Sequence, residues 1–200
     1  MQGFLKVPCD PVGWGVDLMS LSAHKIGGPK GVGALYTAPA LRNLRPLLPG
    51  GGQEGGLRSG TEATAQIAGF ARAVALRQEN LAEKLRHMAD IKAYCREKLL
   101  SIPGVVPVGQ GEAPHILAVS LVGYPSANIV TDLGAKGICI SAGSACHRGK
   151  ASHVVSALHL DKKTAAGVIR VSFGPETTRA DIDGLYQALL DHKNQRFPML

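Results

Sequence analysis

The sequence predicts an α/β fold in two parts, a glycine-rich first part over residues 1–75 and an α+β second part over residues 76–200. Three observations lead to this prediction. Short apolar runs of strand length occur in both parts, one long segment of helical periodicity spans the boundary, and strand-like and helix-like segments alternate in the second part. Glycine accounts for 25 of the 200 residues, which indicates many tight turns or close backbone approaches.

The first part begins with two expected strands. Residues 16–22 and 31–37 are short apolar runs, and the residues between them suit a tight connection. We therefore expect an antiparallel pair with a turn at residues 24–30. Residues 50–56 include five glycines, too many for regular structure, and are expected to form a mobile or ligand-approaching loop.

A long helix is expected over residues 63–100. Apolar residues recur there at helical spacing, namely Ile67, Phe70, Val74, Leu81, Leu85 and Met88. Thr61 is the predicted N-cap, and Pro103-Gly104 is the predicted end. A helix of this length usually bends or joins two domains, so we place the domain boundary near residue 76.

The second part alternates between strands and helices. Strands are expected at residues 116–121, 138–141 and 168–173, and helices at residues 127–136, 154–160 and 178–193.

Composition narrows the function classes. The formal charge of +7 suits an anionic ligand, or is simply a solvated basic surface. Few aromatic residues argue against a base-stacking nucleic-acid surface, and no apolar run reaches membrane-spanning length. The four cysteines form no CxxC pair, which argues against a zinc knot. We expect a cytoplasmic protein with free thiols and without a metal, a membrane contact or direct nucleic-acid binding.

His24 and Lys25 lie between the first expected strand and a glycine-rich turn. Ser22 and His24 are one strand step apart, so they are expected to present polar groups to the same face. Hydroxyl and ammonium groups bind phosphate, an imidazole transfers protons, and a lysine buried enough to lower its pKa suits Schiff-base chemistry. The alternative is an ordinary surface lysine in a turn.

Two further residues are candidates for chemistry. Cys146 follows small residues and precedes cationic ones, which favour the thiolate, so we interpret it as a reactive thiol. The alternative, a buried structural cysteine, better suits Cys139 in its apolar strand. Arg170 is the one charged residue in 167–173, and either faces outward from a strand or binds a substrate carboxylate with its guanidinium fork.

Six segments together resemble a known family. In order along nearly the whole chain they are residues 17–25, 28–36, 50–54, 58–62, 141–146 and 169–174. They are similar to the pyridoxal-phosphate-dependent cysteine desulfurases of the NifS and IscS kind, within the class V aminotransferase family. The resemblance implies a partial type I, aspartate aminotransferase-like fold. Residues 1–75 would belong to the large cofactor-binding domain, and residues 76–200 would be the connecting helix and the small domain with the catalytic cysteine loop.

The resemblance implies how the cofactor, pyridoxal 5′-phosphate, is held. Lys25 would form the Schiff base and shuttle the substrate's α proton. Ser22 and His24 would contact the cofactor phosphate, His24 being also a candidate for proton transfer. Thr61 would reach the phosphate in the partner subunit of a homodimer, and Gln2 would hydrogen-bond the pyridine hydroxyl.

The implied activity is conversion of L-cysteine to L-alanine. Cys146 would attack the substrate sulfur and carry a persulfide, and Arg170 would anchor the substrate carboxylate. The sulfur would go to an acceptor or iron–sulfur scaffold protein, for cluster assembly or tRNA thiolation. Alternatives are a selenocysteine lyase, another class V enzyme, or a non-catalytic remnant or interaction module.

The sequence also departs from the family. About half of a family chain precedes the position of Gln2, including the aspartate, three residues earlier, that pairs with the pyridine nitrogen. We therefore expect a truncated or split desulfurase with little activity alone, and with exposed sheet edges and apolar helix faces.

Overall fold

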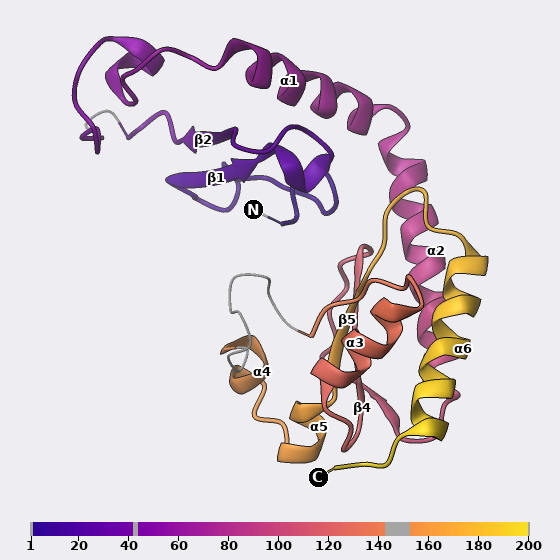
Figure 1. Cartoon of the computed structure of the whole chain (residues 1–200). Coiled ribbons are helices and arrows are strands. Elements are labelled where there is room, and N and C mark those ends of the chain that lie inside the picture. The colour runs from indigo at the N-terminus through magenta and orange to yellow at the C-terminus, as the bar shows by residue number, and fades with distance from the viewer. Residues whose placement is uncertain (1, 42–43, 143–152, 200) are drawn as a thin grey trace. The chain divides into compact units, whose positions relative to one another are not determined.

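The computed structural model describes residues 2–41, 44–142 and 153–199, which divide into two compact units (Figure 1). Unit 1 is Met1–Leu81 and unit 2 is Ala82–Leu200. Within the described residues, no helix combines the length and the apolar character that crossing a membrane requires.

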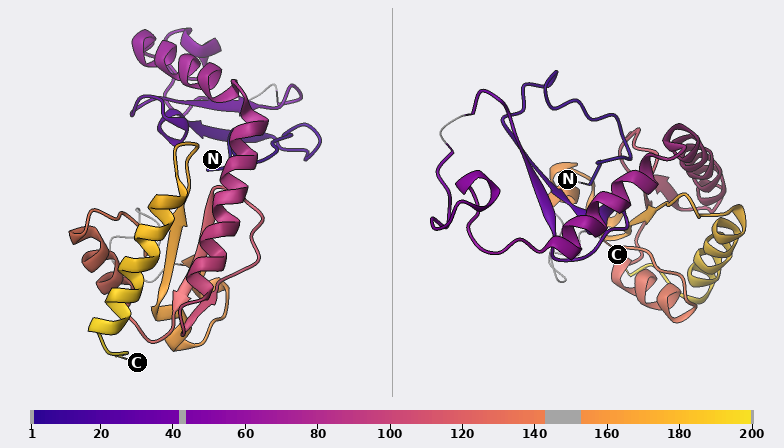
Figure 2. Two further views of the ribbon diagram at one scale, coloured as in Figure 1. Left: turned by 90° about the vertical axis from the view of Figure 1, so that its right-hand side faces the viewer. Right: turned by 90° about the horizontal axis from the view of Figure 1, so that it is seen from above.

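Unit 1 is built around a β-hairpin. Strand β1 (Leu18–Ser22) pairs antiparallel with β2 (Gly33–Thr37), with Ser22 opposite Gly33, as predicted. A one-turn 3₁₀ helix, η1 (Ala23–Ile26), lies between the strands. A second one, η2 (Gln53–Gly56), precedes helix α1 (Thr64–Gln78), which lies next to the hairpin in the views of Figure 2.

The small core of unit 1 joins η1 to α1. Its buried members in the described chain are Ala23 and Ile26 from η1 and Phe70 and Ala73 from α1. A Cβ at Gly69 would lie 2.7 Å from the Pro29 Cγ, so glycine allows α1 to approach the loop that follows η1. The helix therefore supports the turn that carries His24 and Lys25.

Unit 2 is a two-layer α+β structure. Its sheet has the order β3 (Val105–Pro107), β4 (Ile116–Leu121) and β5 (Val168–Ser172), with both pairs antiparallel. Helices α2 (Leu81–Leu100), α3 (Ser126–Ala135) and α6 (Arg179–Gln195) share one apolar core with this sheet. Two short helices, α4 (His153–Ala157) and α5 (Lys162–Ala166), precede β5.

Several expected elements are corrected by the structure. The single helix over 63–100 is two helices, because Asn80 adopts a left-handed conformation with φ of 51° and breaks the hydrogen-bond ladder. The N-cap of α1 is Ala63 rather than Thr61. Residues 138–141 do not form a strand, since Ser141 alone bridges to β5 at Arg170. Strand β3 and helix α5 were not predicted, because neither is long enough to show a period.

Candidate active site

Lys25 and His24 lie side by side in η1, on the surface of unit 1. Strand β1 ends at Ser22, and in the following turn Ala23 and Ile26 are 0% and 5% exposed. In a 3₁₀ helix, residues three apart share a face, so burial of this pair turns His24 and Lys25 outward. The expected burial of Lys25 is therefore wrong, as is the expected alternation of Ser22 and His24 along one strand.

The backbone holds this turn in place from several directions. Gly27 closes η1 with φ of 88°, and both Gly27 and Gly28 donate their N–H to the Ala23 carbonyl oxygen. The Ala23 N–H in turn donates to the Val32 carbonyl oxygen at 3.2 Å. The exposed amine of Lys25 thus extends from a support fixed by buried side chains and by hydrogen bonds.

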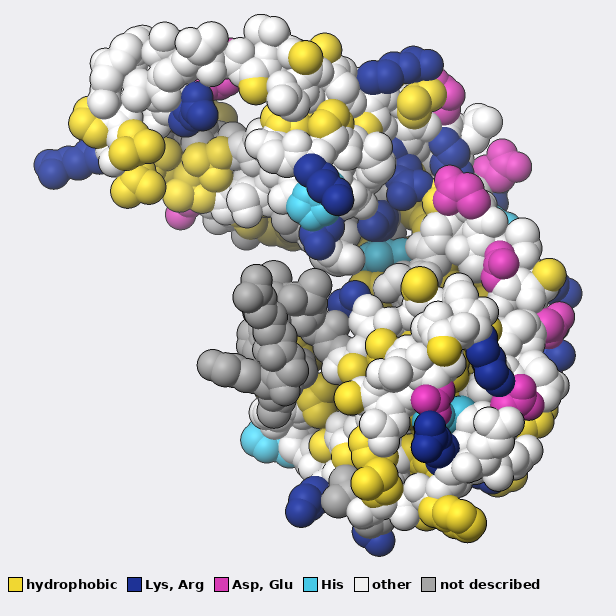
Figure 3. Space-filling model, in the orientation of Figure 1, with side chains coloured by type: hydrophobic (Ala, Val, Ile, Leu, Met, Phe, Trp, Pro, Cys, Tyr) yellow, Lys and Arg dark blue, Asp and Glu magenta, His cyan; other side chains and the backbone are white. Residues whose placement is uncertain are grey.

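Lys6 lies close enough to two other cations, Lys25 and Arg77, for their charges to act on it. Burial, together with the charges of Arg77 and Lys25, lowers the pKa of Lys6. The Arg77 Nε atom is buried and has no hydrogen-bond partner in the described part of the chain. Figure 3 shows several Lys and Arg side chains on the visible face of unit 1. Sequence analysis missed Lys6 and Arg77, since they lie far apart in the chain and in no motif that we recognised.

Gln2 and Thr61 are exposed, and no hydrogen bond between described residues joins them to Ser22, His24 or Lys25. Thr61 follows a loop that is held by a hydrogen bond from the Gly60 N–H to Gln53 Oε1, at 3.3 Å. Their predicted cofactor contacts remain predictions.

Arg170 lies in unit 2, on β5, opposite Ala118 of β4. On its other side Arg170 pairs with Ser141. The Arg170 N–H donates to the Ser141 carbonyl at 2.7 Å, and the Ser141 N–H donates to the Arg170 carbonyl at 3.1 Å. Arg170 Nη2 donates to Ser141 Oγ at 3.3 Å, while its Nε is buried without a partner among the described residues.

The cysteines differ in their surroundings. Cys146 lies outside the described residues, so its predicted role remains a prediction. Cys139 is exposed and outside any strand, which corrects the interpretation of a buried structural cysteine. Cys95 is fully buried in the core of unit 2, and burial raises the pKa of its thiol to about 12. A thiol with so high a pKa is a poor nucleophile at neutral pH.

The groups around η1 fit pyridoxal phosphate chemically. A lysine amine can condense with an aldehyde, and the nearby hydroxyl, imidazole and cationic groups suit a phosphate. The residues that would hold the cofactor are Ser22, His24 and Lys25, with Lys6 and Arg77 adding positive charge. Among the described residues, no group of three or more His, Cys, Asp or Glu side chains is placed to hold a metal ion.

Comparison with known proteins gives consistent results. A family model described as aminotransferase class-V matches residues 1–185. A mitochondrial cysteine desulfurase of Candida albicans is 38% identical over 196 residues, and the match covers 94% of this chain and 40% of that protein. Cysteine desulfurase IscS of Clostridium botulinum is 35% identical, with all of this chain and 52% of that protein covered.

Solved structures agree with these sequence matches. The crystal structure of a NifS-like protein from Rickettsia africae has a TM-score of 0.86 and 29% identity, and covers 97% of this chain. The match covers 52% of the Rickettsia chain. These structures confirm the predicted partial type I fold, and this chain spans about half the length of the proteins it matches, or less.

Proposed function

Since the chain belongs to the aminotransferase class-V family, whose members use pyridoxal 5′-phosphate, we propose that it contributes to a cysteine desulfurase. The observation that carries this proposal is the exposed Lys25 on the η1 turn, whose backbone is held by hydrogen bonds, among groups that suit a phosphate. The reaction would convert L-cysteine to L-alanine and leave the sulfur as a persulfide on the protein.

The cofactor, when bound, supplies an electron sink that allows the α proton of an amino acid to leave. Lys25 Nζ would hold the cofactor through its aldehyde carbon, with loss of water, and as the free amine would accept the α proton and return it. Ser22 Oγ and the imidazole of His24 would hold the phosphate, together with Thr61 of the partner subunit in a homodimer. Gln2 would hydrogen-bond the pyridine hydroxyl.

Arg170 and Cys146 act on the substrate. The Arg170 guanidinium binds the substrate carboxylate and orients the amino acid. The Cys146 thiolate attacks the sulfur of L-cysteine, forming an S–S bond as the carbon–sulfur bond breaks. The electron pair of the broken bond stays on carbon, which takes a proton to give alanine. A sulfur-acceptor or iron–sulfur scaffold protein, in the cytoplasm, then removes the persulfide sulfur.

The proposal is tested by adding pyridoxal phosphate to the pure chain. We expect an absorbance band of a protein-bound Schiff base and, after borohydride reduction, the mass of the cofactor on the peptide that contains Lys25. Lys25→Ala removes both signals. Lys30→Ala is the matched control, because Lys30 is an exposed lysine in the same loop, and it keeps both.

Several outcomes contradict the proposal. A wild-type chain without the band in excess cofactor indicates the alternative of a non-catalytic module. A band that survives Lys25→Ala excludes Lys25 as the attachment site. In the loaded protein, alanine and sulfide release from L-cysteine that persists in Cys146→Ala favours another class V activity, and preference for L-selenocysteine favours the lyase.

A further inference from the structure

We infer that Ser141 is a positioning residue that fixes the guanidinium of Arg170 for carboxylate binding. The inference rests on the proposed function, because that function assigns the carboxylate to Arg170. The inference gives a role to Ser141, which lies 29 positions from Arg170 in the sequence. The resemblance to the family implies no role for this serine.

The backbone places the two side chains next to each other. Ser141 and Arg170 exchange both of their N–H to carbonyl hydrogen bonds, at 2.7 and 3.1 Å, which makes them a hydrogen-bonded antiparallel pair. Directly opposed residues in such a pair extend to the same face of the sheet. The pairing therefore aligns the Ser141 hydroxyl with the Arg170 side chain.

The position of Arg170 in the sheet makes this pairing firm. Hydrogen-bonded and non-hydrogen-bonded pairs alternate along an antiparallel strand, so the N–H and carbonyl of Arg170 both point to Ser141 and away from β4. The adjacent residues of β5, Ile169 and Val171, pair with β4 and are buried in the core of unit 2. Strand β5 is thus held by Ser141 at one edge and by β4 at the other.

The hydroxyl of Ser141 restricts the guanidinium itself. Arg170 Nη2 donates to Ser141 Oγ at 3.3 Å, a hydrogen bond from a charged donor that is slightly longer than the usual range. The Nε atom is buried, so a carboxylate is expected on the Nη atoms. A long arginine side chain has many rotamers, and ordering it on binding costs free energy. The serine contact orders the side chain beforehand, which strengthens carboxylate binding.

This role predicts a specific kinetic pattern. Arg170 would hold the carboxylate equally in the ground state and the transition state, because the carboxylate is remote from the bonds that break. Loss of the Ser141 contact is therefore expected to raise KM with little change in kcat. If Ser141 were merely structural, its replacement would lower the stability of the sheet without raising KM relative to kcat.

The test measures binding of L-alanine to the cofactor-loaded chain, with the change in absorbance as the signal for binding. Ser141→Ala is expected to weaken binding two- to tenfold, about the effect of one hydrogen bond. Ser172→Ala, which removes an exposed serine of the same strand, is the matched control and leaves binding unchanged. Ser141→Thr, which keeps the hydroxyl, restores the wild-type affinity.

A double-mutant cycle with Arg170→Ala tests the coupling. We expect Ser141→Ala to have no further effect once Arg170 is absent. Additive effects of the two substitutions overturn the inference. If Arg170→Ala itself leaves alanine binding unchanged, the substrate role of Arg170 fails, which is a failure of the proposed function.

A second measurement needs no cofactor. In the ¹⁵N-labelled chain, the Arg170 Nε–H signal is expected to exchange faster and to show greater side-chain mobility in Ser141→Ala than in wild type or Ser172→Ala. Unchanged exchange and mobility would show that the hydroxyl does not order the guanidinium.

Discussion

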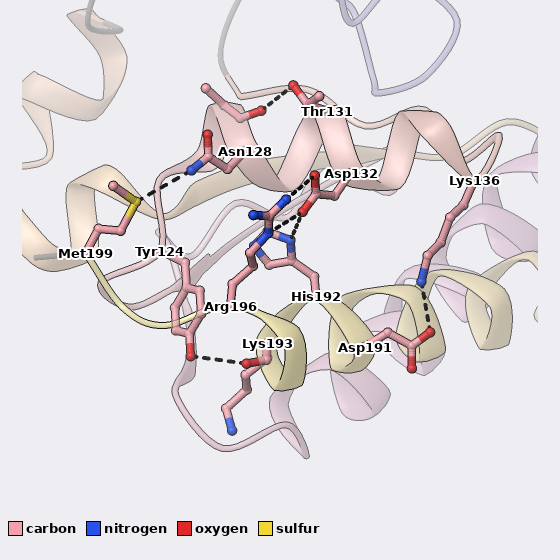
Figure 4. Close-up of polar contacts among 11 residues, drawn as sticks. Tyr124, Asn128, Thr131, Asp132, Lys136, Asp191, His192, Lys193, Arg196 and Met199 are labelled. Carbon is pink, nitrogen blue, oxygen red and sulfur yellow. Dashed lines mark hydrogen bonds and ion pairs between the residues drawn. The ribbon is translucent and has the colours of Figure 1, made fainter.

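Asp132 of α3 joins two side chains at the end of α6, those of His192 and Arg196. It accepts a hydrogen bond from His192 Nδ1 at 2.9 Å and two from Arg196, at 3.1 and 3.2 Å (Figure 4). His192 is 3% exposed, and its ring lies 5.9 Å from that of Tyr124. These contacts fasten the end of α6 to α3 and border a pocket of about 310 Å³, lined by none of the predicted site residues.

We expect Asp132→Asn to lower the melting temperature in a pH-dependent way. Hydrogen bonds from Arg196, and then from His192, hold the pKa of Asp132 below its ordinary value of 3.8. Because the pKa of Asp132 is lower in the folded chain than in the unfolded chain, the ionised carboxylate stabilises the fold fully at a pH above the ordinary pKa of 3.8. This stabilisation is lost as the pH falls through the pKa of the folded chain. The difference in melting temperature from wild type should therefore be constant near neutral pH and shrink below about pH 4.

Thermal unfolding followed by circular dichroism from pH 7 to pH 3 measures this difference. Asp90→Asn is the control, since Asp90 is an exposed carboxylate of α2 without an ion pair among the described residues. A difference for Asp132→Asn that does not change with pH would contradict the prediction.

Two glycines of unit 2 are expected to respond oppositely to alanine. Gly167 has φ of −92°, which alanine adopts easily, but its Cβ would overlap the Leu121 carbonyl oxygen. Gly184 lies inside α6, where an added Cβ has no atom within 4 Å. We predict a loss of about 1–3 kcal/mol of unfolding free energy for Gly167→Ala. Gly184→Ala should gain about 0.5–1 kcal/mol from helix propensity. Urea titrations compare the two, and equal effects would refute the steric argument.

Helix α6 depends on the capping of its first turn. Thr178 Oγ1 accepts the Asp181 N–H at 3.2 Å, and Asp181 Oδ2 accepts the Thr178 N–H at 2.8 Å, a reciprocal capping box. The buried face of α6 carries Ile182, Leu185 and Leu189 into the core of unit 2. The cap thus sets where a core helix begins.

Thr178→Ala is expected to cost about 1 kcal/mol of unfolding free energy, because the Asp181 N–H loses its acceptor. Urea denaturation measures the change in midpoint. Thr178→Ser keeps the hydroxyl and should lie within a few tenths of a kcal/mol of wild type. If the serine variant is as unstable as the alanine variant, the capping oxygen is not the cause.

The elements that the sequence predicted well are segments whose apolar residues form a clear run between turn residues. Strands β1 and β2 are predicted from short apolar runs, and β4, β5 and helix α6 from the alternation of strand-like and helix-like segments. The break between α1 and α2 is not predicted, because the apolar spacing continues across it and only the backbone of Asn80 departs from the helix. The exposed Cys139 was misjudged because an apolar sequence around it does not require pairing in a sheet.

At the scale of the whole molecule, local motifs were predictable and long-range contacts were not. The position of Lys25 between a strand and a glycine turn is local, and the sequence indicates it directly. The proximity of Lys6 to Lys25 and to Arg77 depends on how distant segments pack, as does the pairing of Ser141 with Arg170. Neither pattern has a period or a fixed spacing that single-sequence reasoning can detect.

The two units differ in the amount of core that holds them together. Among the described residues, the core of unit 2 has nineteen buried members, while that of unit 1 has Ala23, Ile26, Phe70 and Ala73. Unit 1 also exposes large apolar side chains, among them Trp14 at 56%, Leu47 at 93% and Leu48 at 68%. Buried apolar area is the main stabilising contribution to folding, so unit 1 is expected to open at lower free energy.

Hydrogen exchange followed by mass spectrometry at rising urea concentration tests this difference on the whole chain. Peptides from β1, β2 and α1 should lose protection at lower urea than peptides from β4, β5 and α6. Gly167→Ala should lower the urea midpoint of the second group and leave the first unchanged, because its steric overlap lies entirely within unit 2. A common midpoint for all peptides, shifted as a whole by Gly167→Ala, would mean that the chain unfolds as one cooperative unit and that the small core of unit 1 does not limit its stability.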